Sequence, residues 1–250
     1  NHTKQSDYLS AVSGVSPSDV SDTELGLALG LILNNQFNEK RGLRAEVDGV
    51  LRILIVLTDG ACNCSVSIPA KNIRDQNIVI YAIGIDNYVL ANLQAIASSK
   101  SHVYEVSTST ELDKFISTLT SSMCNEPRPV SLNNTIITNV AKSTFEYFTY
   151  EINESANLEI NVVDLSGSTI VYVSRTNPHP YKYDFAFDLS IQKHKVIVIS
   201  GRISTKVKRS TDDELTQQIY VAVTSDTESA SFQIEANECD PSNCTEGTNE

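Results

Sequence analysis

The stretch Ile53-Leu54-Ile55-Val56-Leu57-Thr58-Asp59-Gly60 decides the fold. Its first five residues are all apolar, so a strand formed here presents apolar side chains on both faces, as strands do in parallel sheets covered by helices. Asp59-Gly60 then ends the strand with residues typical of a turn. Ligands of open α/β sheets gather beyond the carboxyl ends of the strands, so Asp59 is predicted to face a crevice and to hold a cation there. An ordinary Asp-Gly turn is the alternative.

Helix and strand patterns alternate around that stretch. Ser21-Asp22-Thr23-Glu24 resembles a helix start, and Leu25, Ala28, Leu29 and Ile32 follow on one helical face. Further strands are predicted at 78–85 and 102–106, and further helices at 69–73, at 89–98 and after the capping box at 108–111. The apolar faces of the last two helices comprise Leu90, Leu93 and Ala97, and Leu112, Phe115, Ile116, Leu119 and Met123. This order predicts a parallel α/β sheet with flanking helices and right-handed crossovers in a first domain at 1–124.

The periodicity changes after Cys124. Residues 125–131 contain two prolines and are predicted to be a stiff linker. Residues 132–236 then show apolar residues at every second position, which predicts a second, all-β domain, an antiparallel sandwich or jelly roll. The inward positions are predicted to be Leu158, Ile160 and Val162; Ile170 and Tyr172; Tyr181, Tyr183, Phe185, Phe187 and Leu189; Val196 and Val198; Ile219, Val221 and Val223; and Phe232 and Ile234. Residues 237–250 are polar and read as the start of a third, cysteine-bearing module.

Composition excludes several classes of protein. The chain has 250 residues, of which 40% are hydrophobic and 20% charged, so it can bury a sizeable core. Its net charge of −12 argues against a nucleic-acid partner, because proteins that bind polyanions concentrate Lys and Arg. No apolar run is long enough for a membrane span. The start at Asn1, without a leader, leads us to expect a fragment or mature piece of a longer protein.

The cysteines favour an extracellular location. There are five, an odd number, so the chain cannot pair all of them internally. Cys239 and Cys244 lie in a polar tail, a setting more typical of disulfide-linked extracellular modules than of cytosolic enzymes. A redox role for the Cys-x-Cys pair is the weaker alternative, and the histidines show no zinc-ligand spacing. The disulfide candidates are Cys62, Cys64, Cys124, Cys239 and Cys244, and Asn-x-Ser/Thr glycosylation sequons occur at Asn1, Asn63, Asn133, Asn153 and Asn243.

Four segments together resemble a known family. They are Thr23-Glu24-Leu25-Gly26-Leu27-Ala28-Leu29, the strand ending in Thr58-Asp59-Gly60, Val79-Ile80-Tyr81-Ala82-Ile83-Gly84-Ile85, and Ser107-Thr108-Ser109-Thr110-Glu111-Leu112. In this order and approximate spacing they resemble the second half of a von Willebrand factor A-type domain. The resemblance covers roughly the first half of the chain and implies a partial Rossmann-like domain that lacks its first strand.

This resemblance implies a metal-ion-dependent adhesion site. In that family Mg²⁺ or another divalent cation is held by an Asp-x-Ser-x-Ser motif, a Thr that opens a later helix, and the Asp of a Thr-Asp-Gly turn. Thr23 and Asp59 match the last two, and the first motif is absent from these 250 residues. Metal binding is therefore expected in the full-length protein and weak here. The alternative role for Thr23 is a helix N-cap. The resemblance also implies that the disulfide partner of Cys124 precedes the first strand.

The second domain resembles the pre-peptidase C-terminal type of β-sandwich. The similarity rests on Phe145-Glu146-Tyr147-Phe148-Thr149-Tyr150, Leu158-Glu159-Ile160-Asn161-Val162, Ile219-Tyr220-Val221-Ala222-Val223 and Ser231-Phe232-Gln233-Ile234. Cys239 and Cys244 resemble the first two cysteines of an epidermal-growth-factor-like repeat. The aromatic stripe from Tyr181 to Leu189 is predicted to belong to the core rather than to a carbohydrate platform.

These observations predict an extracellular adhesion or matrix protein. It would bind a protein ligand that offers an acidic side chain to a divalent cation, because a hard cation that is incompletely neutralised accepts a further oxygen ligand. No nucleophile and base are paired in the sequence, so we expect no enzyme. Two alternatives stay open: an accessory region of a secreted hydrolase, and a purely structural matrix protein without metal.

Overall fold

The computed structural model describes residues 4–16, 24–37, 39–62, 64–153, 156–181, 194–199, 216–239 and 244. The chain forms two compact units: Asn1–Arg44 with Ile53–Ser117, and Ala45–Arg52 with Thr118–Glu250. It therefore passes from one unit to the other three times, after Arg44, Arg52 and Ser117. Among the described residues, no helix is long and apolar enough to cross a membrane.

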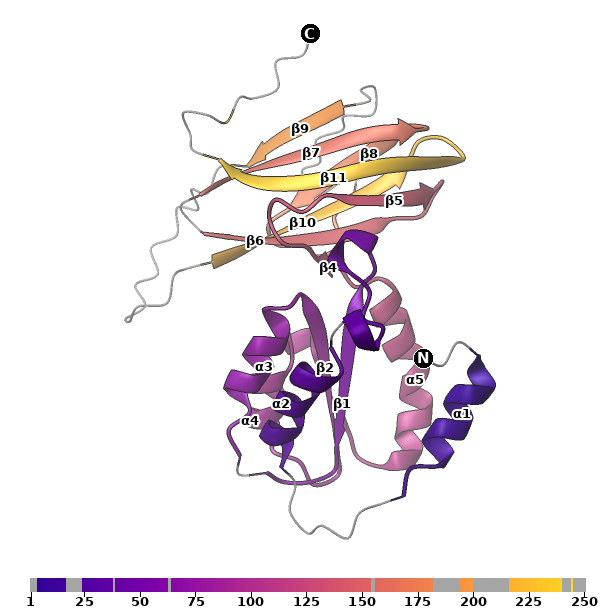
Figure 1. The fold of residues 1–250 in the computed structure, drawn as a ribbon, viewed down its shortest axis with the longest axis vertical. Helices are drawn as coiled ribbons and strands as arrows, with labels where there is room; N and C mark the ends of the chain where they lie inside the picture. Colours follow the sequence, from indigo (N-terminus) through magenta and orange to yellow (C-terminus); the bar gives the residue numbers. More distant parts are fainter. Residues whose placement is uncertain are drawn as a thin grey trace. The chain divides into compact units, whose positions relative to one another are not determined.

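The first unit contains a parallel sheet with flanking helices (Figure 1). Its three strands lie in the order β1-β2-β3, and the parallel register of the last two pairs Ala82 with Val103 and Ile85 with Val106. The elements are α1 (Gln5–Ser13), α2 (Leu25–Asn35), η1 (Glu39–Arg41), β1 (Arg52–Thr58), α3 (Ser67–Arg74), β2 (Ile78–Ile85), α4 (Leu90–Ile96), η3 (Lys100–His102), β3 (Val103–Val106) and α5 (Ser109–Cys124). The predicted parallel sheet is confirmed, but β1 is not covered on both faces as predicted, because its Ile55 and Leu57 are 38% and 50% exposed.

One face of this sheet is covered by α2, α3 and α4 (Figure 1). Their apolar side chains join those of β1 and β2 in a single core whose buried members are Leu29, Val56, Val66, Ala70, Ile73, Ile78, Ile80, Ala82, Leu93, Ile96 and Ala97. Fully burying one Leu or Ile stabilises a fold by about 1.5–3 kcal/mol, so these contacts hold the three helices on the sheet.

Aromatic residues pack on the other face. Tyr81 is fully buried, and its ring lies 4.4 Å from that of His102 and 6.2 Å from that of Tyr104, centroid to centroid. Tyr104 in turn packs against Phe115 of α5 at 4.6 Å. Since β2 is buried from Ile78 through Gly84, both of its faces are covered, as a continuous apolar run requires.

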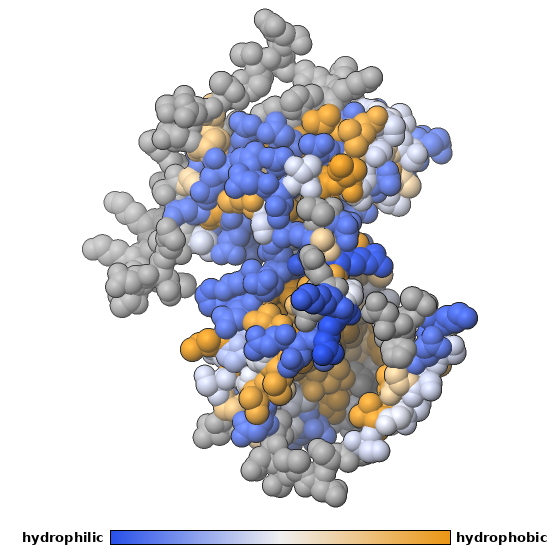
Figure 2. Space-filling model, in the orientation of Figure 1, coloured by the Kyte–Doolittle hydropathy of each residue, from blue (hydrophilic) through white to orange (hydrophobic). Residues whose placement is uncertain are grey.

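The predicted helix faces need three corrections. Ala28 is exposed, Leu90 is 40% exposed and Ile116 is 51% exposed, although all three were predicted to lie on the apolar faces of their helices. The side chain of Leu112, predicted on the same face as Ile116, lies outside the described residues. In α4 the inward residues are Leu93, Ile96 and Ala97, because the helix begins only at Leu90. Helix α2 has apolar residues on every side, so its Leu27 and Leu31 are 62% and 52% exposed. Figure 2 shows hydrophobic residues at the surface of the first unit. Helix α1 was not predicted at all.

The second unit is built from two four-stranded sheets. Their orders are β4-β6-β10-β8 and β5-β11-β7-β9, with antiparallel pairing throughout except between β4 and β6. The elements are η2 (Glu46–Asp48), β4 (Arg128–Pro129), β5 (Ile136–Ala141), β6 (Glu146–Asn153), β7 (Asn157–Ser166), β8 (Thr169–Ser174), β9 (His194–Ile199), β10 (Thr216–Ser225) and β11 (Ser229–Cys239). The antiparallel strands with alternating burial agree with the all-β pattern of this half of the sequence.

The two sheets share one hydrophobic core. Its buried members from the sheets include Ile136 and Val140; Phe148, Tyr150 and Ile152; Leu158, Ile160 and Val162; Val171 and Val173; Ile199; Ile219, Val221 and Val223; and Phe232 and Ile234. The inward row of β7 ends at the buried Asp164. Its carboxylate accepts hydrogen bonds from the Thr169 hydroxyl at 2.6 Å and the Thr169 backbone N–H at 3.2 Å. These bonds hold the connection by which the chain passes from β7 in one sheet to β8 in the other, and they satisfy the buried carboxylate.

Several details differ from the predicted β pattern. The core residues of β8 are Val171 and Val173 rather than Ile170 and Tyr172, because every residue from Ile170 to Val173 is apolar or aromatic and alternation alone cannot choose the inward face. Arg128 and Pro129, in the predicted linker, pair with β6. Tyr181 is 49% exposed rather than in the core. The rest of that stripe, Tyr183, Phe185, Phe187 and Leu189, lies outside the described residues, as do the side chains of Val196 and Val198.

A short segment before β1 completes the second unit. The Glu46 carboxylate accepts hydrogen bonds from the Ser131 backbone N–H at 2.6 Å and from the Ser131 hydroxyl at 3.2 Å. Gly49 has a φ of 62°, and a Cβ on it would lie 2.8 Å from Ile136 Cγ2 and 3.4 Å from Arg128 Nη1. The segment therefore needs a residue without a side chain at this turn.

Replacing Gly49 by Ala should destabilise the second unit. The left-handed backbone and the contact with Ile136 together should lower the free energy of unfolding by about 1–3 kcal/mol. Urea denaturation of the whole chain measures this. Gly30→Ala is the control, because no atom lies within 4 Å of its added Cβ, so it should raise helix stability by about 0.5–1 kcal/mol. Equal urea midpoints for Gly49→Ala and the unaltered chain would contradict this reading.

Candidate functional site

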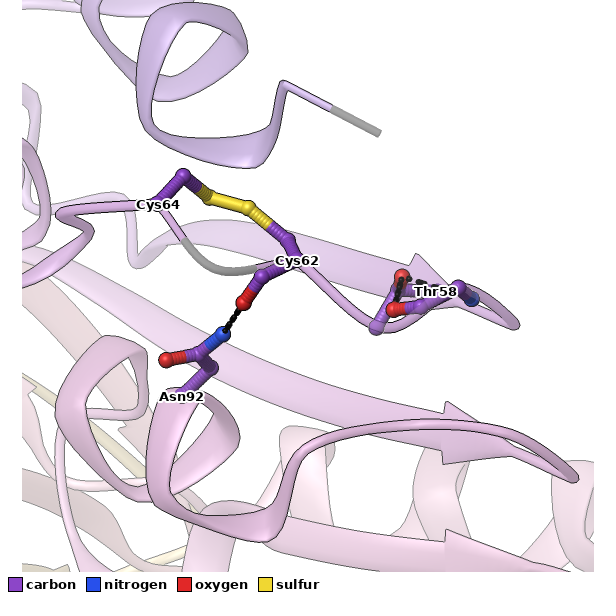
Figure 3. Close-up of a disulfide and its surroundings, with 5 residues drawn as sticks. Thr58, Cys62, Cys64 and Asn92 are labelled. Atoms are coloured by element: carbon purple, nitrogen blue, oxygen red, sulfur yellow. Dashed lines mark hydrogen bonds between the residues drawn. A yellow bond between two sulfur atoms is a disulfide. The ribbon is translucent and has the colours of Figure 1, made fainter. Parts of the chain in front are cut away.

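The candidate site is the turn at the carboxyl end of β1. Asp59 follows the last residue of that strand and is exposed. Its carboxylate makes no hydrogen bond or ion pair within the described part of the chain, and so it stays available to an external ligand. The backbone beside it is fixed by the Thr58 hydroxyl, which donates to the Gly60 carbonyl and accepts from the Gly60 N–H, each at 3.3 Å (Figure 3).

The loop after this turn is tied down from two directions. A disulfide joins Cys62 to Cys64, whose Cα atoms are 5.3 Å apart. From α4, Asn92 Nδ2 donates a hydrogen bond of 2.6 Å to the carbonyl oxygen of Cys62 (Figure 3). Cys62 itself is buried. The loop downstream of Asp59 therefore has a fixed course, set by one covalent link and one side chain from a helix.

Helix α2 begins beside the same loop. Its Gly26 packs so closely on Ser65 that a Cβ would overlap the Ser65 carbonyl oxygen. Thr23, the second predicted metal ligand, precedes this helix and lies outside the described residues. The structure therefore brings the start of α2 next to the loop that follows Asp59, whereas the Thr23 side chain stays a prediction.

The neighbouring strand ends carry a second acidic rim residue. Asp86 follows β2, is exposed, and has a φ of 57°, and its backbone N–H donates to the Val106 carbonyl at 3.1 Å. Near it, the Tyr88 hydroxyl donates a hydrogen bond to the Glu105 carboxylate. That bond, with smaller contributions from desolvation and from the charge of Glu105, raises the pKa of Tyr88 above its usual value.

The described residues alone do not form a divalent-cation site. Among them no three His, Cys, Asp or Glu side chains come together as metal ligands would. Asp59 fits one ligand position, because it is exposed and unneutralised, but a hard cation takes six or more oxygen ligands. A complete site would therefore need Thr23 and oxygen atoms from beyond this part of the chain.

The cysteines separate into two bonded pairs and one thiol. Besides the first pair, Cys239 at the end of β11 is bonded to Cys244, with a Cα–Cα distance of 5.5 Å. Cys124, the last residue of α5, is exposed and has no disulfide partner among the described residues. The two bonds support the predicted disulfide character of the chain.

The sequence did not predict the residues that support the turn. Asn92 and Gly26 act through contacts with Cys62 and Ser65, which lie 30 and 39 positions away along the chain. Gly26 and its neighbour Gly30 look alike in sequence, and only the first packs on a backbone carbonyl. The one signal available was a glycine near the start of an apolar helix, which by itself is ambiguous.

Comparison with known families gives one clear match. Residues 1–118 match the von Willebrand factor type A domain. The match covers both strands whose ends form the rim and includes Thr23 and Asp59. The predicted A-type domain is therefore supported for the first half of the chain.

Two relatives illustrate where such domains occur. The chain is 32% identical over 135 residues to the collagen alpha-1(XII) chain of Notophthalmus viridescens, which covers 53% of this chain and 14% of that one. It is 35% identical over 104 residues to matrilin-2 of Mus musculus, covering 41% and 11%. The chain thus spans only a small part of these relatives. Its predicted extracellular location agrees with theirs.

A solved structure is also similar in part. It is proximal thread matrix protein 1 from the mussel byssus with a zinc-occupied MIDAS motif, at 21% identity and a TM-score of 0.45. The alignment covers 55% of this chain and 32% of that one.

Replacing Asn92 by Ala should loosen the loop after Asp59. The buried Cys62 carbonyl would lose its donor, which costs about 1–3 kcal/mol. Hydrogen exchange should become faster at the amides of residues 60–66, and the free energy of unfolding should fall. Asn72→Ala is the matched control, because Asn72 is exposed on α3 and its side chain makes no hydrogen bond within the described residues. If both variants exchanged alike, the Asn92 bond would have no role in holding the loop.

Proposed function

Starting from the A-type match of residues 1–118, we propose that this chain is part of an extracellular adhesion or matrix protein. Its A-type region binds a protein ligand through the rim that carries Asp59. The ligand contributes an acidic side chain, and the interaction is coordination rather than catalysis.

The observation that supports this proposal is the state of Asp59. It is an exposed carboxylate at the carboxyl end of a strand, with no cation of the described chain beside it. A structural Asp in a turn usually caps a nearby backbone N–H, and Asp59 does not, because the Thr58 hydroxyl receives the Gly60 N–H instead. The carboxylate is thus left free for a ligand.

We assign Asp59 and Thr23 as two ligands of a divalent cation, Mg²⁺ or a similar hard ion, in the full-length protein. When bound, such an ion supplies a positive charge that can accept an oxygen from a partner carboxylate. The contribution of this chain is to present Asp59 on a turn of fixed course, held by the Thr58–Gly60 hydrogen bonds and the tied loop after it. The remaining oxygen ligands are not supplied by the described residues.

The second unit is proposed to act as a spacer or secondary contact. Two four-stranded sheets around one core suit a β-sandwich of the pre-peptidase C-terminal type, at roughly 132–236. The proposed linker at 125–131 and the proposed epidermal-growth-factor-like start at 237–250 both contribute to this unit, because Arg128 and Pro129 pair with β6 and β11 continues to Cys239. Cys239 and Cys244, which resemble the first two cysteines of that module, are bonded to each other, whereas in such a repeat each would pair with a later cysteine.

Asp59→Asn in the full-length protein should weaken divalent-cation-dependent binding to a matrix ligand. The variant removes a charged oxygen ligand and should reduce affinity at least about tenfold, the equivalent of roughly 1.4 kcal/mol. Binding to an immobilised matrix extract with Mg²⁺, and then with EDTA, measures this.

Asp86→Asn provides the matched control for that experiment. Asp86 is another exposed acid at a strand end, so its replacement by Asn changes the net charge by the same amount. Asn also tolerates the left-handed backbone at this position. We expect unaltered binding from this variant. Binding that persists in EDTA and is insensitive to Asp59→Asn would instead favour a structural matrix protein without metal.

A further inference from the structure

One glycosylation sequon of the second unit lies in an exposed, well-defined turn. Asn133-Asn134-Thr135 connects β4 to β5. Asn133 is exposed and has a φ of 63°, and its backbone N–H donates to the Ala236 carbonyl at 2.9 Å. Its side-chain amide makes no hydrogen bond to any described residue. The backbone is therefore anchored while the side chain is free.

A second sequon of this unit differs in each of these respects. Asn153 is half-buried at the end of β6 and lies opposite Thr216 of β10. Its backbone N–H donates to Glu238 Oε1 at 3.3 Å. Asn153 is therefore part of a strand pair, whereas Asn133 lies in a turn. Asn1, Asn63 and Asn243 lie outside the described residues.

We propose that Asn133 carries an N-linked oligosaccharide. In the reaction, Asn133 Nδ2 forms a bond to C1 of the first sugar of a lipid diphosphate-linked oligosaccharide and loses one proton, while the lipid diphosphate leaves with the electrons of the broken C1–O bond. The extracellular location places the chain in the secretory pathway, where that donor is present. The inference depends on that location and not on metal-dependent adhesion.

The topology determines when this modification takes place. The Thr135 hydroxyl donates to Glu235 Oε2 at 2.5 Å, and these residues are 100 positions apart. The turn therefore gains its final contacts only when β11, the last strand, pairs with β5. Until β11 has been synthesised, the whole sequon is accessible, so the transfer precedes closure of this sheet.

The position of the glycan also gives it a physical role. β5 is one of the two edge strands of its sheet; the Gly49 segment packs on its first residues, and its Ile137 is nevertheless 56% exposed. An edge strand with an exposed apolar side chain is prone to pair with other chains unless it is covered. An oligosaccharide three residues before this strand would shield it.

Peptide mapping of the secreted protein tests the proposal. The whole chain is secreted from an animal cell line, treated with peptide N-glycosidase in ¹⁸O-labelled water and digested. We expect labelled aspartate at position 133 in most molecules and a lower fraction at position 153. An unlabelled peptide across position 133 in secreted protein would overturn the proposal, and that result needs no variant and leaves the adhesion proposal untouched.

Three variants identify the source of the signal. Asn133→Gln should remove one glycan, seen as a single downward step on a gel, and should increase self-association of the purified protein. Asn134→Gln changes the middle residue of the sequon and should leave the glycan in place. Thr135→Ser keeps both the sequon and a hydroxyl for Glu235, so it should also be glycosylated. Loss of a glycan in Asn134→Gln, or an unchanged gel mobility of Asn133→Gln, would contradict the assignment.

Discussion

The first unit depends on the burial of β2 on both of its faces. Ile80, Tyr81 and Ile83 have no exposed surface, so each face needs its own cover. The helices α2, α3 and α4 supply one cover, and the row of rings that begins at Tyr81 supplies the other. Asp59 lies beyond the carboxyl end of the neighbouring strand β1, at the edge of the sheet where ligands of open α/β sheets bind.

The sequence was sufficient to predict elements whose local pattern has one solution. The uninterrupted apolar run of β2 correctly predicted a strand covered on both faces, whereas the similar run of β1 did not, because Ile55 and Leu57 are exposed. The end of the β1 run placed Asp59 at the carboxyl end of the strand. Prediction from the sequence failed where two structural arrangements fit the same pattern of residues. Ile170 through Val173 offer two apolar faces, and only packing selects Val171 and Val173. The Glu46 contacts with Ser131 span 85 positions, so no local pattern could predict them.

The candidate site, too, could be predicted only in part from the sequence. Its chemical group, the Asp59 carboxylate, follows from position in the sequence, whereas its support follows from contacts between distant segments. Asn92 meets Cys62 only because α4 and the loop after β1 lie at the same end of the sheet. In a site of this kind the exposed side chain binds the ligand, while the contacts of the neighbouring loop fix the position of its backbone.

Electrostatics explains why the proposed function uses a bridging cation. The chain has a net charge of −12, and an acidic ligand side chain approaching Asp59 would meet repulsion from that carboxylate. At physiological salt the screening length is about 8 Å, so the remaining surface charge matters little and the nearest carboxylate decides the local energy. Two carboxylates in contact need a positive charge between them, and no Lys or Arg of the described chain is paired with Asp59. A metal ion would meet that need and would make the interaction sensitive to chelation rather than to the charge of the surrounding surface.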